Sequence, residues 1–213
     1  MVDLGRNLTA STLSYRAGEV PKAPMGRQLE GSTLAILGYG QIGQRLAALA
    51  VALKMRVLVY DPYKRVGNRG VEQCDLPRAL AESDFVACLV VANEATENLM
   101  NAAAFAQMKR GAYFINASRG NLVDESALRA ALDSGHLAGC ALDVGRAPDQ
   151  MPSAELARHP RVVATPHSAG LTLPAVEHQA LETVAQVAEI VRGRAPKGSV
   201  NADRATRLAR LNG

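Results

Sequence analysis

Residues 33–61 read TLAILGYGQIGQRLAALAVALKMRVLVYD, and this stretch decides the fold. Short apolar runs flank a segment rich in Ala and Leu, residues with high helix propensity. The pattern predicts a strand, a helix and a second strand, in that order, over residues 33–37, 41–53 and 56–60. The second strand is stopped at Asp61-Pro62, because a residue before proline is restricted and proline lacks an N–H. Two strands joined by a helical crossover are parallel neighbours in a sheet.

The same alternation continues along the chain. Further strands are predicted at 85–91, 112–116, 137–144 and 161–165, and further helices at 76–83, 101–109, 124–135 and 174–193. The strands are nearly continuous apolar runs, as expected for strands covered on both faces. The fold class is therefore α/β, a doubly wound parallel sheet of the Rossmann type. We expect residues 31–196 to form this dinucleotide-binding domain, 1–30 to be a connecting helix and arm, and 197–213 to be a polar tail.

A glycine-rich turn lies between the first strand and its helix. It has the form G-x-G-x-x-G and consists of Gly38, Tyr39, Gly40, Gln41, Ile42 and Gly43. The first glycine permits a tight turn, the second lets a pyrophosphate approach the backbone, and the third lets the helix pack against the strand. The helix also points free N–H groups and its positive dipole end at the phosphates. The alternative is a plain strand–helix turn with no ligand.

Asp61 supports the ligand-binding interpretation. It ends the next strand, close to the expected spacing of about 20 residues. A carboxylate there accepts hydrogen bonds from both ribose hydroxyls of NAD and repels the 2′-phosphate of NADP. We therefore predict NAD as the cofactor, although Arg65 is close enough to leave NADP open.

Composition excludes several classes of protein. The chain has 213 residues, 48% of them hydrophobic and 21% charged, which is ordinary for a globular domain. Lys and Arg number 24 against 20 acids, and aromatic residues make up 4%, so neither nucleic-acid binding nor base stacking is favoured. No membrane span or signal peptide is visible. Cys74, Cys88 and Cys140 form no C-x-x-C pair, so no disulfide or metal site is predicted and a cytoplasmic location is expected.

Two later segments carry a family resemblance. Residues 116–144 read NASRGNLVDESALRAALDSGHLAGCALDV, and residues 165–172 read TPHSAGLT. The N-x-x-R-G, G-x-x-L-D-V and P-H-x-x-G-x-T motifs, together and in this order, resemble the D-isomer-specific 2-hydroxyacid dehydrogenases. That family includes phosphoglycerate dehydrogenases and glyoxylate and hydroxypyruvate reductases. The resemblance implies an NAD-dependent oxidoreductase acting on a small 2-hydroxy or 2-keto acid.

The resemblance also implies residue roles. Arg119 matches the arginine that binds the substrate's carboxylate and carbonyl oxygen, a role that suits a guanidinium fork. His167 matches the general acid/base, whose imidazole exchanges protons near neutral pH. Asp143 matches the residue that meets the nicotinamide amide. Further coenzyme contacts are implied for Pro62, Thr96, Ala117, Ser118, Arg119 and His167.

The sequence departs from the family pattern around the catalytic acid. In the family, a glutamate after the L-D-V strand pairs with the catalytic histidine, but Pro148 stands at that position here. Asp149, one residue later, is the candidate to replace it. Leu89 and Val91 also stand where the family has a histidine and a proline.

The family's N-terminal substrate domain has no counterpart in residues 1–30, which are too few for a second α/β unit. Residues 1–20 resemble the segment through which family members embrace a partner subunit. Leu4, Leu8 and Leu13 would need a neighbour to cover them, so we expect a homodimer.

Three interpretations follow. The first is an active NAD-dependent oxidoreductase that uses Arg119 and His167. The second is a catalytically impaired NAD-binding dimer module, favoured by the altered acid position and the missing domain. The third places the chain with other Rossmann enzymes, such as alanine dehydrogenases or S-adenosylhomocysteine hydrolases, which the N-x-x-R-G and P-H elements disfavour.

Overall fold

The strands form one parallel sheet in a computed structural model that describes residues 1–199 and 202–204. Within those residues the sheet has seven strands in the order β3-β2-β1-β4-β5-β6-β7. Their bounds are β1 (Thr33–Leu37), β2 (Arg56–Tyr60), β3 (Val71–Gln73), β4 (Phe85–Cys88), β5 (Ala112–Asn116), β6 (Leu137–Leu142) and β7 (Val162–Ala164). Every pairing is parallel, which confirms the predicted fold class.

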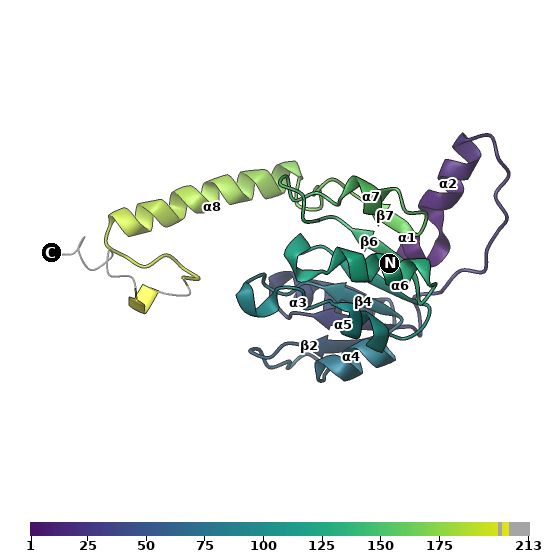
Figure 1. Ribbon diagram of the computed structural model, residues 1–213. Coiled ribbons are helices and arrows are strands. Elements are labelled where there is room, and N and C mark those ends of the chain that lie inside the picture. The colour runs from purple at the N-terminus through teal and green to yellow at the C-terminus, as the bar shows by residue number, and fades with distance from the viewer. Residues whose placement is uncertain (200–201, 205–213) are drawn as a thin grey trace. The chain divides into compact units, whose positions relative to one another are not determined.

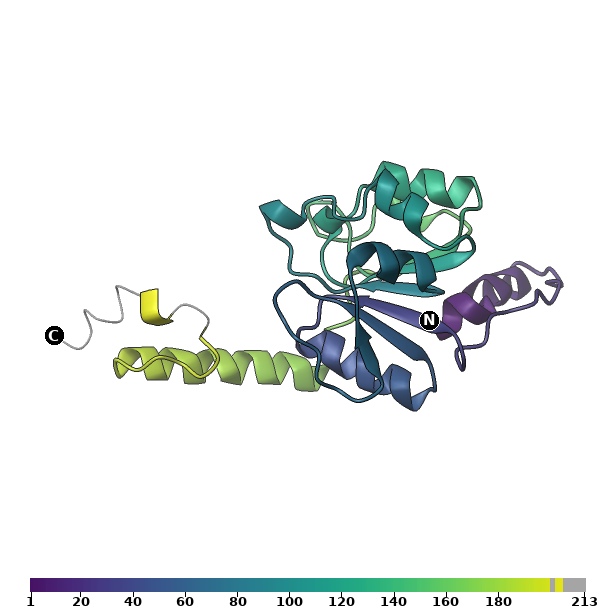
Figure 2. The ribbon, with the colours of Figure 1, turned by 90° about the horizontal axis from the view of Figure 1, so that it is seen from below.

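Helices cover both faces of the sheet (Figures 1 and 2). Their bounds are α1 (Val2–Arg6), α2 (Leu8–Arg16), α3 (Gln41–Ala52), α4 (Leu76–Glu82), α5 (Ala102–Gln107), α6 (Glu125–Asp133), α7 (Ala154–Ala157) and α8 (Leu173–Val191), with 3₁₀ turns η1 (Glu94–Thr96), η2 (Gly120–Leu122) and η3 (Ala202–Arg204). Several begin at side chains that accept a backbone N–H, as N-caps do, namely Asp75, Asn101, Asp124, Ser153 and Thr172.

The core is divided between the two faces of the sheet, as the interior strand β1 shows. Leu34 and Ile36 pack with the α3 face, and Ala35 and Leu37 pack with the opposite face under α4, α5 and α6. This alternation follows from the two-residue period of a strand. All five residues of β1 are buried, so the strand that leads into the glycine-rich turn is fixed in the core.

The two buried cysteines belong to this core. Cys88 ends β4 and Cys140 lies inside β6, and both thiols are free. Burial raises the pKa of each thiol to about 12. Both are therefore unreactive core residues near neutral pH.

By its internal packing the chain divides into two units, Met1–His167 and Ser168–Gly213. The first contains the whole sheet. The second contains α8, which begins at the Thr172 cap and carries exposed apolar residues, namely Leu173, Val176, Leu181, Val184, Val187, Ile190 and Val191. The predicted boundaries at residues 30 and 196 stay predictions, and most of the predicted tail lies outside the described residues. In the part of the chain that the structure describes, no helix is long and apolar enough to cross a bilayer.

The structure adds elements that the sequence pattern did not indicate. These are β3 and the short helix α7. In addition, the strand predicted at 85–91 ends early, at Cys88. β3 is a half-exposed edge strand whose residues are Val, Glu and Gln, so it lacks the apolar run of its neighbours. It forms because it pairs with β2.

A buried acid holds the amino edge of the sheet. Asp84 directly precedes β4, and its side chain is 8% exposed. Its Oδ1 accepts hydrogen bonds from Arg27 Nη1 and Lys109 Nζ, each at 2.7 Å, and its Oδ2 accepts from the Thr33 backbone N–H at 2.9 Å. The Arg27 N–H in turn donates to the carbonyl of Gly5 at 2.7 Å. Asp84 therefore connects β1, the turn before β5 and the N-terminal segment.

We predict that Asp84→Asn lowers the free energy of unfolding by about 2 kcal/mol, because it removes the charge of a buried carboxylate that binds two partly exposed cations, Arg27 and Lys109. Burial works to raise the pKa of Asp84, but Lys109, the Thr33 N–H and Arg27 lower it overall. This contribution is therefore full above about pH 4 and is lost as the pH falls through the folded-state pKa. Urea unfolding of both proteins between pH 7 and pH 3 measures it, with exposed Glu177→Gln as the control. A difference that grows toward pH 3 would contradict the assignment.

Candidate functional site

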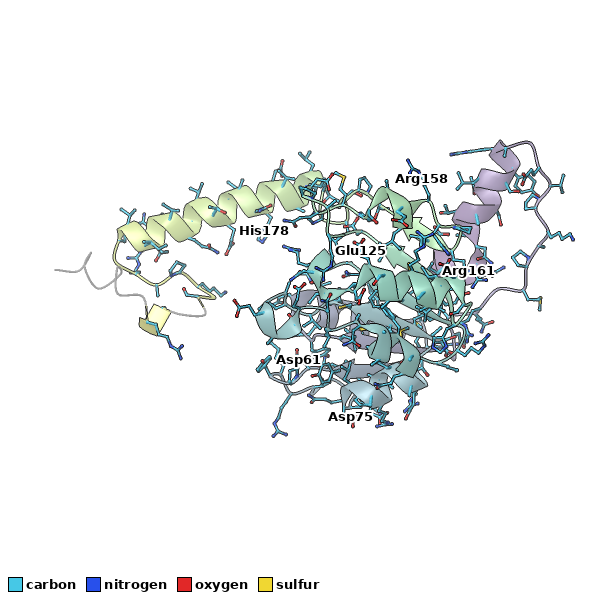
Figure 3. All side chains as sticks on the ribbon, in the orientation of Figure 1. Asp61, Asp75, Glu125, Arg158, Arg161 and His178 are labelled. Atoms are coloured by element: carbon cyan, nitrogen blue, oxygen red, sulfur yellow. The ribbon has the colours of Figure 1, made fainter. Side chains whose placement is uncertain are left out.

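The predicted site residues meet at the carboxyl edge of the sheet. Gly38 follows β1, Asp61 follows β2, Arg119 follows β5, Asp143 follows β6 and His167 follows β7. Parallel strands all end at the same edge, and ligands of open α/β sheets bind there at the point where the strand order reverses. In this sheet that point lies between β1 and β4. Figure 3 shows Asp61 at this edge and Arg161, which precedes β7, at the opposite one.

The surroundings of the three glycines of the turn differ. Gly38 has φ +97°, and a Cβ on it would lie 2.7 Å from the carbonyl oxygen of Leu89. A Cβ on Gly43 would lie 2.2 Å from the carbonyl oxygen of Gly38. Gly40 has an ordinary φ of −70°, and a Cβ there would meet nothing within 4 Å. The fold itself thus requires glycine at 38 and 43, whereas the open space at Gly40 fits the close approach of a pyrophosphate.

Asp61 is held to the turn by its own carboxylate. Oδ2 accepts the Tyr39 N–H at 2.7 Å, and Oδ1 accepts the N–H groups of Tyr63 and Lys64, each at 2.9 Å. Partial burial works to raise the pKa of Asp61, but these three donors outweigh it and the pKa lies below its ordinary value. Asp61 is therefore a fixed, ionised acceptor at the tip of β2.

A cavity of about 340 Å³ opens beside Asp61 and the glycine-rich turn. Its lining includes predicted residues, namely Gly38, Gly40, Asp61, Pro62 and Thr96. It also includes residues that the sequence analysis did not assign to the cofactor, such as Tyr63, Lys64, Leu89 and Val91. Both Leu89 and Val91 follow β4, which ends at Cys88, whereas the predicted strand at 85–91 includes them. The size is within the range of small-molecule sites.

Arg119 lies on a loop that is tied down on both sides. The Asn116 side chain accepts the Ser118 N–H at 3.1 Å and donates to the carbonyl of Arg119 at 2.8 Å. The Ser118 hydroxyl donates to the carbonyl of Val90 at 2.6 Å, which joins this loop to the one after β4. The Arg119 side chain is exposed, and its Nη1 donates to the carbonyl of Ser118 at 2.7 Å. The loop thus presents a guanidinium at the edge of the sheet.

His167 lies on a turn directly after β7. Its φ is +50°, a conformation that L residues rarely adopt. Its N–H donates to the carbonyl of Asp143 at 2.9 Å, and the N–H of Asp143 donates to the carbonyl of Asn116 at 3.1 Å. Backbone hydrogen bonds therefore run from the strand that leads to Arg119, through Asp143, to the His167 turn.

Asp149 makes its hydrogen bond within its own loop. Its Oδ1 accepts the N–H of Met151 at 3.0 Å, within a loop that the Gly145 N–H closes onto the carbonyl of Gln150 at 2.9 Å. In the described part of the chain, neither a hydrogen bond nor an ion pair joins Asp149 to His167. The suggestion that Asp149 replaces the family glutamate stays a prediction.

Arg146, in the same loop, makes the contacts that the sequence did not indicate. Its side chain donates to the carbonyls of Val123 at 2.9 Å and Asn121 at 3.0 Å, to Asn98, and to Glu97 at 2.8 Å. Arg146 thereby connects the loops after β4, β5 and β6.

Among the described residues, no group of three His, Cys, Asp or Glu side chains could hold a metal ion.

The sheet, the glycine-rich turn and Asp61 define a dinucleotide-binding α/β domain. The profile of the family described as D-isomer specific 2-hydroxyacid dehydrogenase, NAD binding domain, matches residues 1–169. The chain belongs to this family, and NAD is its cofactor.

Three relatives illustrate the similarity. D-3-phosphoglycerate dehydrogenase 3 from Arabidopsis thaliana is 36% identical over 93% of this chain, which spans 34% of that protein. Hydroxypyruvate reductase from Thermotoga maritima is 34% identical over 88% of this chain, which spans 62% of the enzyme. D-lactate dehydrogenase from Aquifex aeolicus, solved with NAD and lactic acid, aligns at a TM-score of 0.81 and 30% identity and covers 90% of this chain and 63% of its own. The chain thus spans about one third to two thirds of these relatives.

We predict that Gly40→Ala and Gly43→Ala separate cofactor binding from folding. Gly43→Ala forces a carbonyl to move and should lower the melting temperature by about 2–8 °C. Gly40→Ala should melt within about 2 °C of the wild type but bind NADH about tenfold more weakly, because its methyl group occupies the open space. Thermal unfolding and NADH fluorescence titration measure the two effects. Undiminished NADH binding by Gly40→Ala would contradict the pyrophosphate assignment.

Proposed function

We propose that the protein uses NAD(H) to interconvert small 2-hydroxy and 2-keto acids. The observation that carries the proposal is the pair of backbone hydrogen bonds that joins Asn116, Asp143 and His167. These residues lie at the same edge of the sheet as the glycine-rich turn. This arrangement supports a substrate site between the Arg119 loop and the His167 turn. The relatives, which include a phosphoglycerate dehydrogenase and a hydroxypyruvate reductase, act on acids of this class by their names.

The chain's residues divide the chemistry between them. Bound NADH supplies the hydride. Arg119 binds the carboxylate of the keto acid through its fork of N–H donors and polarises the carbonyl that accepts the hydride. His167 gives a proton to the resulting alkoxide, and takes it back in the reverse direction. Asp149 is proposed as the carboxylate that assists His167, which requires its loop to rearrange.

We further propose a preference for NAD over NADP. The carboxylate of Asp61 is ionised and held in place by three N–H donors. A 2′-phosphate placed at the same ribose would meet this negative charge. Lys64 and Arg65 follow closely and weaken the repulsion without removing it.

A catalytically impaired NAD-binding module is the second candidate function. Pro148 stands where the family has its glutamate, and Asp149 is bonded to its own loop. Such a module would bind NADH with normal affinity but turn over no keto acid.

The two candidates are distinguished by assay of NADH oxidation with glyoxylate, hydroxypyruvate and phosphohydroxypyruvate. For an active enzyme, His167→Ala should lower kcat by about 10²–10⁴-fold. Arg119→Gln should raise the KM for the acid, because the bidentate partner of the carboxylate is lost. The exposed Arg110→Gln, which precedes β5 at the opposite edge of the sheet, and His178→Ala on α8 are the matched controls. NADH binding without turnover on any acid would favour the second candidate.

We also propose a homodimer formed through the N-terminal segment. Leu4 is buried within this chain, so the expectation that it needs a neighbour was wrong, because α1 packs against the sheet. Leu8, Leu13 and Tyr15 of α2 are 50–63% exposed, and Val20 and Met25 of the following loop are 87% and 100% exposed. Figure 1 shows α2 and this loop extending from the body of the sheet. A cavity of about 310 Å³ lies between α1, α2 and the start of β7. A second copy would cover these side chains and fill the cavity.

We predict that Leu13→Asp converts a dimer into a monomer and raises the dimer dissociation constant by at least about tenfold, because it removes apolar burial and introduces a charge. Its effect on the melting temperature, compared at equal monomer content, should be small, because Leu13 is already exposed within one subunit. Light scattering across micromolar concentrations measures this, with Leu49→Asp on α3, also exposed, as control. A wild-type monomer at these concentrations would overturn the proposal.

A further inference from the structure

Thr165 makes a contact that none of the assigned roles uses. Its hydroxyl donates a hydrogen bond to Oδ1 of Asp143 at 2.5 Å. Asp143 is 8% exposed, so this carboxylate lies largely out of water. A short hydrogen bond to a partly buried carboxylate is among the stronger neutral-to-ion contacts in proteins. It restricts the rotation of the carboxylate.

The two residues extend neighbouring strands. Leu142 of β6 pairs with Ala164 of β7, so Asp143 and Thr165 are the next positions in register. The Thr165 N–H donates to the carbonyl of Leu142 at 2.9 Å. The hydrogen bond between their side chains therefore closes the end of the β6–β7 pair, directly before the His167 turn.

The sheet topology places this pair at the nicotinamide end of the cofactor site. Asp61, at the tip of β2, belongs to the half of the sheet that binds the adenosine. A dinucleotide crosses the switch point between β1 and β4, so its other half lies over the ends of β4, β5 and β6. The carboxamide of nicotinamide carries N–H donors, which a carboxylate accepts well.

We propose that Thr165 is a positioning residue that holds the Asp143 carboxylate for the nicotinamide carboxamide. The inference deepens the proposed function, on whose cofactor site it rests. The Thr165 hydroxyl donates its hydrogen bond to Oδ1, which fixes the orientation of the Asp143 carboxylate as a hydrogen-bond acceptor. Thr165 itself touches no reacting atom.

The test compares ligands with and without the nicotinamide, on the chain as it exists. Thr165→Val keeps the shape of the side chain but removes the donor, and Thr165→Ser keeps the donor. We expect Thr165→Val to bind NADH about tenfold more weakly, the usual size for loss of a hydrogen bond to a charged group. Its affinity for ADP-ribose, which lacks the nicotinamide, should stay within twofold of the wild type. Thr165→Ser should bind both ligands like the wild type. NADH fluorescence and calorimetry with ADP-ribose give the dissociation constants.

Two results would overturn the inference. One is unchanged NADH binding by Thr165→Val, and the other is equal weakening of NADH and ADP-ribose, which indicates a general structural effect. If Thr165→Val does not fold, as judged by circular dichroism, Thr165→Ala replaces it with the same expectations. A protein that shows the predicted pattern but no turnover would contradict the proposed activity and still support the role of Thr165.

Discussion

The contact between Gly43 and the carbonyl of Gly38 is the constraint on which the rest of the site depends. A side chain on Gly43 would stand 2.2 Å from that oxygen, so α3 can begin this close to β1 only with glycine at that position. The close start of α3 brings its first N–H groups and its dipole to the switch point of the sheet. The Asp61 carboxylate then bonds the N–H of Tyr39 and fixes the turn against β2. Strands β1 and β2 and helix α3 thus meet at one turn.

The other half of the edge is organised by Asp143. Its N–H binds the carbonyl of Asn116, its carbonyl binds the N–H of His167, and its side chain binds Thr165. Asp143 therefore connects the end of β5, from which the Arg119 loop starts, to the His167 turn, mainly through backbone groups. Backbone frames of this kind tolerate change in nearby side chains, which fits the unusual loop of Gly145, Arg146 and Pro148 beside an otherwise ordered edge.

Much of this arrangement could be predicted from local sequence, and the remainder could not, for physical reasons. The turn, Asp61 and the main strands follow from short-range chemistry, because glycine spacing, apolar runs and a following proline act within a few residues. β3 was missed because its pairing with β2, rather than its own composition, makes it a strand. The surroundings of Asp149 and the contacts of Arg146 depend on how separate loops meet. The contribution of Leu89 and Val91 to the cavity was not predicted, because the sequence did not locate the end of β4, which these residues follow.

The hydrogen bond between Arg27 and Gly5 gives the N-terminal segment a particular topology. The chain leaves the body of the protein near Gly5 and returns to it at Arg27, where Asp84 anchors it again. The residues between Gly5 and Arg27 form a segment whose two ends are both held at the core. Changes in the length or composition of such a loop alter the surface it offers while leaving the anchors in place. The surface of this loop can therefore change without disturbing the coenzyme-binding edge of the sheet.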